Sequence, residues 1–170
     1  MSYGVLLIRV FVGLAFVGHG TQKLFGWFGG YGPQGTGGFF AQQGYRMGVV
    51  MAVVAGLCEA GGGTLLALGL ATPLACALVA IVMLNAIGSV TFKRNTFMLG
   101  SELELSYLVT AVGLAAIGPL RFSLDRAIGW DDNISGVWWG VAVLASAAVV
   151  SLATLTLGRS KPTTEPAAQT

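Results

Sequence analysis

Long stretches without any charged residue are the most constraining feature of this 170-residue chain. Between Glu59 and Lys93 lie 33 consecutive residues without Asp, Glu, Lys or Arg, and a Leu-Ala-Thr-Pro sequence at 70–73 divides them between two predicted helices. A helix of about 20 apolar residues crosses the hydrocarbon core of a bilayer. Only 9% of the chain is charged, whereas about a quarter of a soluble domain is. The sequence therefore predicts an all-α integral membrane protein.

Five membrane-spanning helices are predicted, at residues 4–25, 47–70, 72–92, 103–118 and 136–157. Pro73 suits the first turn of the third helix, where a missing N–H costs nothing. The first helix could instead be a secretory signal peptide, but residues 1–4 lack the positive charge that such peptides carry. The connection 26–46 alternates glycine with aromatic residues. It is interpreted either as an interfacial anchor or as a lid over a ligand cavity.

The distribution of basic residues predicts the orientation, because cytoplasmic loops are enriched in Lys and Arg. Arg121 and Arg126 lie on one predicted side, and six basic residues lie on the other: Lys23, Arg46, Lys93, Arg94, Arg159 and Lys161. A plasma (inner) membrane location follows, with the N-terminus outside and the C-terminus cytoplasmic. A net charge of only +2 argues against nucleic-acid binding. The predicted divisions are a four-helix domain at 1–120, an extracytoplasmic connection at 121–135, a fifth helix at 136–158 and a disordered cytoplasmic tail at 159–170.

Two basic residues are predicted to share one face of the first helix. Arg9 and Lys23 are 14 residues apart, which places them about 40° apart around the axis. Gly13, Phe16 and Gly20 lie between them and leave a groove that another helix could enter. Lys23 alone could simply extend to the lipid headgroups. His19 flanks the same face.

Glu59 is predicted to pair with Arg9 inside the membrane. Counting from the cytoplasmic ends of their helices places the two residues within roughly 5 Å in depth, and a buried ion pair needs both partners. Asn85 is the predicted neighbour of Glu59 across the turn at 70–73. The pair could serve only to fix the helix register, or it could form part of a ligand site.

A second polar cluster is predicted at the cytoplasmic end of the fourth helix. Glu102 and Glu104 are two residues apart, so they cannot both point inward. Glu104 is the better inward candidate, level with His19 and Lys23, although the helix dipole alone would also favour an acidic residue there. No metal site is predicted, because the chain has one histidine and lacks metal-ligand spacing. Cys58 and Cys76 are predicted to be too far apart in depth for a disulfide.

Three stretches give the chain a resemblance to a known family. Arg9 and Gly13, followed by Gly-His-Gly-Thr-Gln-Lys-Leu-Phe-Gly-Trp at 18–27, resemble the first helix of DoxX membrane proteins. Residues 59–63 and 68–73 are similar to the second-helix pattern of that family, and residues 102–104 to the entry of its fourth helix. The resemblance, over about residues 4–120, implies a four-helix membrane bundle related to the small subunit of thiosulfate:quinone oxidoreductase. The fifth helix lies outside it.

The resemblance implies a membrane subunit of an oxidoreductase system, with quinone as the candidate cofactor. The candidate ligand-binding or buried polar residues are Arg9, His19, Lys23, Glu59, Asn85 and Glu104. Whether the chain itself is an enzyme is left open. The alternatives are a non-catalytic anchor that recruits soluble redox enzymes and a small anion transporter. Candidate partners are the lipid bilayer, a soluble oxidoreductase or sulfur-transfer enzyme on the cytoplasmic side, and a second copy of the chain.

Overall fold

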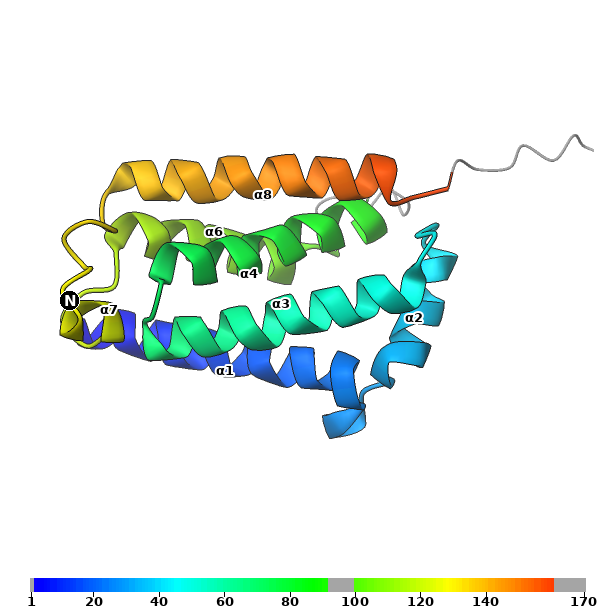
Figure 1. The fold of residues 1–170 in the computed structure, drawn as a ribbon, viewed down its shortest axis with the longest axis horizontal. Coiled ribbons are helices and arrows are strands. Elements are labelled where there is room, and N and C mark those ends of the chain that lie inside the picture. The colour runs from blue at the N-terminus through cyan, green and yellow to red at the C-terminus, as the bar shows by residue number, and fades with distance from the viewer. Residues whose placement is uncertain (1, 92–99, 161–170) are drawn as a thin grey trace, which may run out of the picture.

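Five long helices lie side by side along the longest axis of the protein (Figure 1). The computed structural model describes residues 2–91 and 100–160, and this part of the chain contains helices and no β-strand. The long helices are α1 (Ser2–Phe25), α3 (Gly48–Leu68), α4 (Thr72–Ala86), α6 (Glu102–Ile117) and α8 (Val137–Leu157). The shorter elements are η1 (Trp27–Gly29), α2 (Gly32–Gln42), η2 (Ile87–Thr91) and α7 (Leu124–Ala127). The predicted all-helical fold is confirmed.

The lengths and hydropathies of these helices match a multi-pass membrane protein. Within the described residues, four helical segments are long and apolar enough to cross a membrane: Ser2–Phe25, Gly48–Leu68, Thr72–Ser89 and Val137–Leu157. α6 is shorter, at 16 residues, but it packs in the same bundle (Figure 1). α1 begins at one end of the bundle and α8 ends at the other (Figure 1). Which end faces the cytoplasm stays a prediction.

α1 and α3 approach each other more closely than side chains would normally allow. A methyl group at Gly13 would lie 2.5 Å from the carbonyl oxygen of Gly63, and one at Gly20 would lie 2.5 Å from the backbone nitrogen of Ala60. Small residues at such positions let helix backbones touch, which drives helix association in lipid. α3 thus occupies the groove that the sequence predicts on α1, and these glycines fix the register between the two helices.

The turn between α3 and α4 needs left-handed backbone at two residues. Gly69 caps α3 with φ 64°, and Ala71 has φ 47°. Pro73 then lies in the first turn of α4, where its fixed φ is already helical. The turn lies where the Leu-Ala-Thr-Pro sequence at 70–73 predicts it, because this signal depends only on neighbouring residues.

The aromatic and glycine-rich connection folds into η1 and α2. α2 lies across the end of α1 and α3 (Figure 1), and a methyl group at Gly37 would lie 2.6 Å from the Cα atom of Val49. The bundle end that carries α2 is called the α2 end below, and the opposite end the α7 end.

The fifth long helix belongs to the bundle. α8 packs against α4 and α6 (Figure 1), and Val143 and Ala147 belong to the shared apolar core. The predicted disorder of the tail concerns residues 159–170, of which 161–170 lie outside the described residues. Three of the basic residues that predict the orientation also lie outside the described residues: Lys93, Arg94 and Lys161.

Candidate functional site

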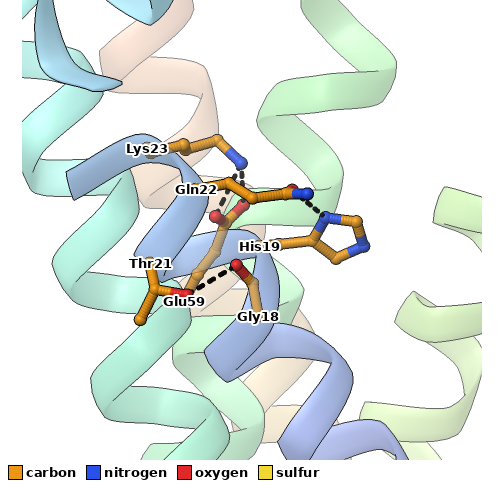
Figure 2. A network of polar contacts seen from close by, with 6 residues as sticks. All are labelled: Gly18, His19, Thr21, Gln22, Lys23 and Glu59. Carbon is orange, nitrogen blue, oxygen red and sulfur yellow. Dashed lines mark hydrogen bonds and ion pairs between the residues drawn. The ribbon is translucent and has the colours of Figure 1, made fainter. Parts of the chain in front are cut away.

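A buried ion pair joins α1 to α3 near the α2 end. Lys23 Nζ donates hydrogen bonds to both carboxylate oxygens of Glu59, at 2.9 and 2.6 Å. The Glu59 side chain is 3% exposed and that of Lys23 is 23% exposed. A carboxylate this deeply buried requires a partner, and Lys23 supplies both the charge and the hydrogen bonds. Figure 2 shows the pair beside His19 and Gln22.

The ion pair follows from the α1–α3 register. Gly20 of α1 contacts Gly56 and Ala60 of α3, so Lys23, one turn further along α1, projects past the level of Glu59. Its four-carbon chain reaches back to the carboxylate while the backbone stays near the end of the helix. Lys23 is therefore neither a pure headgroup anchor nor a solvent-exposed charge.

The predicted Arg9–Glu59 pair is wrong. The Arg9 side chain is buried at the α7 end, where it donates to the carbonyl oxygen of Phe122 and its guanidinium lies against Gly69. The prediction placed the last turn of α1 level with the first turn of α3. Instead α3 extends past the end of α1, because α2 packs on that first turn through Gly37 and Gly48. This offset moves Arg9 away from Glu59.

The predicted contact between Asn85 and Glu59 is also wrong. Asn85 Nδ2 donates to the carbonyl oxygen of Ile81 and to Ser151 Oγ, both at 3.0 Å. Asn85 thus ties α4 to α8 rather than to α3. Both Asn85 and Glu59 nevertheless line the same cavity, because the cavity lies between α3 and α4 at this level.

A cavity of about 420 Å³ lies inside the bundle at the α2 end. This volume falls within the range of roughly 300–1,000 Å³ typical of small-molecule sites. Its walls come from α1, α2, α3, α4, α6 and α8 and are mainly apolar and aromatic, with Phe16, Phe39 and Phe40 among them. Its polar lining residues are His19, Lys23, Gln43, Tyr45, Glu59, Asn85, Ser89, Glu104, Tyr107 and Thr154.

Five of the six candidate residues lie around this cavity, and Arg9 does not. Glu104 is half-buried and lines the cavity, whereas Glu102 is exposed. Glu104 is thus the residue of the two that faces inward. His19 is exposed and lies at the cavity wall, where its Nδ1 is 3.1 Å from Gln22 Oε1. Their part in ligand binding stays a prediction.

Several polar residues of the cavity were not predicted from the sequence. Tyr45 Oη and Ser89 Oγ are both buried and lie 2.8 Å apart. Ser89 is four residues after Asn85 on one helix, and this spacing could have indicated it. Tyr45 follows the glycine-rich stretch, and no local pattern distinguishes it from the other aromatic residues there.

A second buried polar cluster at the α7 end was also missed. Asp125 is fully buried and accepts hydrogen bonds from the backbone N–H of Ala71 at 2.7 Å and of Thr72 at 2.9 Å. Thr72 Oγ1 donates to it at 2.7 Å. The carboxylate thus caps the N-terminus of α4, and its charge also opposes that of Arg9. Both residues hold the bundle together at this end.

The described part of the chain contains no group of three or more His, Cys, Asp and Glu side chains that could hold an ion. Cys58 lines the cavity and Cys76 is buried, both as free thiols. The arrangement instead offers apolar walls, hydrogen-bond donors and two carboxylates, which suits an apolar ligand with a polar ring.

Comparisons with known proteins agree with the resemblance seen in the sequence. Residues 4–94 match the model of the DoxX family, so the match ends before Glu104 and α8. The chain is 35% identical over 122 residues to a Bacillus subtilis (strain 168) protein named "Putative oxidoreductase CatD", a region that covers 72% of this chain and 84% of that protein. No solved structure matches the chain significantly.

Proposed function

This chain belongs to the DoxX family of membrane proteins, and from that premise we propose that it is the membrane subunit of an oxidoreductase system that binds a quinone in the cavity at the α2 end. The observation that carries the proposal is the buried Lys23–Glu59 ion pair in the wall of a mainly apolar cavity. Ionisable groups at membrane depth are costly and usually serve function. The name of the CatD relative supports the link to redox chemistry.

The residues around the cavity fit a quinone. The apolar side chains suit an isoprenoid chain, and an ammonium group has three N–H donors, of which two go to Glu59. The third donor of Lys23 and the Nε2 atom of His19 would hold the ring oxygens. A bound quinone would supply two-electron redox chemistry, and Glu59 and Glu104 would carry the accompanying protons. Arg9 has no part in this site.

The proposal also includes a soluble redox partner and an orientation of the chain in the membrane. Electrons would pass between the ring and a soluble oxidoreductase or sulfur-transfer enzyme docked at the α2 end. That end would face the cytoplasm of a plasma (inner) membrane, with α1 beginning outside. Arg46 and Arg159 lie at the α2 end, which supports this orientation because cytoplasmic loops are enriched in basic residues.

Thermal unfolding of the purified protein with and without a short-chain ubiquinone analogue tests the site. The analogue should raise the melting temperature of the wild type, since a ligand that binds only the folded state stabilises it. Glu104→Gln should reduce this shift, while Glu102→Gln, a matched change of an exposed residue on the same helix, should leave it intact. Identical melting of the wild type with and without the analogue contradicts the proposal.

A further inference from the structure

The end of α8 is joined to the end of α2 by a short paired segment. Residues 44–46 and 158–160 form it, with Gly158 O accepting from the backbone N–H of Arg46 at 3.1 Å and Gly44 O from that of Ser160 at 2.9 Å. Tyr45 and Arg159 face each other in an antiparallel bridge. We call residues 44–46 and 158–160 the clasp.

Side chains strengthen the clasp. The Arg159 guanidinium lies 5.1 Å from the centre of the Tyr45 ring, a cation–π geometry, and its Nη2 is 3.4 Å from the carbonyl oxygen of Ser89. The Tyr45 hydroxyl is hydrogen-bonded to Ser89 Oγ. Arg159 and Tyr45 therefore bind the same residue at the end of the α4–η2 segment, so three parts of the chain meet there.

The clasp adjoins the cavity wall. Phe39 and Phe40 of α2 and Gln43 directly after it line the cavity, and Tyr45 continues this wall with its ring 5.6 Å from that of Phe40. α8 lines the same cavity through Val150 and Thr154. A helix outside the matched family region thus both lines the cavity and ties down the segment that covers it.

We propose that the clasp holds the end of α2 and the segment after it in place over the cavity, which makes Arg159 and Tyr45 positioning residues for the ligand. The consequence for ligand binding rests on the proposed function, but the effect on the cavity wall does not. Without the clasp, α2 would remain attached to α3 through its close contact at Gly37 and Gly48. The segment that follows α2, which carries the cavity-lining Gln43 and Tyr45, would then open and expose the cavity to reagents.

Cys58 provides a native reporter because its half-buried thiol lines the cavity. The full chain carrying Cys76→Ala, which removes the other, buried thiol, is reacted with N-ethylmaleimide in lipid nanodiscs. Arg159→Ala should increase the labelling rate of Cys58 by about three- to tenfold, as expected for the loss of a cation–π contact and a hydrogen bond. Arg159→Lys, which retains a cation over the ring, should restore most of the slow rate.

Arg121→Ala is the matched control, because the Arg121 guanidinium lies 5.8 Å from the centre of the Phe122 ring at the α7 end, away from the cavity. It should leave the labelling rate of Cys58 unchanged. Equal rates in the wild type and Arg159→Ala, or an equal increase in Arg121→Ala, overturn the role of the clasp.

A second measurement separates this proposal from the quinone site. A short-chain ubiquinone analogue should slow the labelling of Cys58 in the wild type and do so less in Arg159→Ala. If the analogue has no effect on the wild type while Arg159→Ala still labels faster, the quinone proposal fails and the clasp stands. If the analogue protects both proteins equally, the clasp does not position the ligand.

Discussion

Lys23 and Glu59 are 36 residues apart in the chain, yet the Lys23 ammonium donates to both oxygens of the Glu59 carboxylate. The pair joins the last turn of α1 to the middle of α3 and forms part of a cavity wall. It therefore contributes to the packing of two membrane helices and to the polarity of the cavity. These two contributions can be separated by mutation.

Lys23→Met should destabilise the protein strongly, because it leaves the buried Glu59 carboxylate without its counter-charge. Removing one partner of a buried ion pair typically costs about 3–5 kcal/mol. The double variant Lys23→Met with Glu59→Met should recover much of this loss, since apolar residues of similar volume are tolerated in its place. Unfolding in mixed SDS micelles measures the difference, and a single variant as stable as the wild type would show that the pair is not formed.

The close approach of α1 and α3 predicts different effects at two neighbouring glycines. Gly20→Ala should destabilise the bundle by about 1–3 kcal/mol, the usual range for overpacking, because the added methyl group would meet the backbone of Ala60 and Gly56. Gly18→Ala is the matched control, as nothing lies within 4 Å of a methyl group there. The same unfolding measurement compares the two, and equal stabilities would contradict the observed register.

Much of the fold was predictable from the sequence because its signals are local. Long, mainly apolar segments predicted the five helices, and Pro73 with the preceding residues predicted the α3–α4 turn. The two-residue spacing of Glu102 and Glu104 was sufficient to predict that only one of them faces inward. Each of these inferences depends on residues within one helix or one turn.

The partners of Arg9 and Glu59 could not be predicted in the same way. Their relative depth depends on how far α3 extends beyond α1, which is set by α2 packing on the first turn of α3. Helical periodicity gives the face of each residue but carries no information on such an offset. The cap at Asp125 was missed for a related reason, as its three donors lie more than 50 residues away in the chain.

Asp125→Ala should destabilise the α7 end. The change removes three hydrogen bonds from the start of α4 and the negative charge that opposes the buried Arg9. The loss of a helix cap costs about 0.5–2 kcal/mol, and the buried guanidinium adds to this. Asp132→Ala, at an exposed position seven residues on, should unfold like the wild type in SDS micelles. A stable Asp125→Ala protein would mean that the cap is dispensable.

The orientation in the membrane can be determined with two introduced cysteines. Asn133 is exposed beyond the α7 end and Ser160 is exposed beyond α8 at the α2 end. In a background of Cys58→Ala and Cys76→Ala, a membrane-impermeant maleimide added to intact cells should label Asn133→Cys, because the α7 end is predicted to lie outside. Ser160→Cys should be labelled only after the cells are lysed. The reverse pattern would place the α2 end outside, and any soluble redox partner of the cavity would then have to be extracytoplasmic.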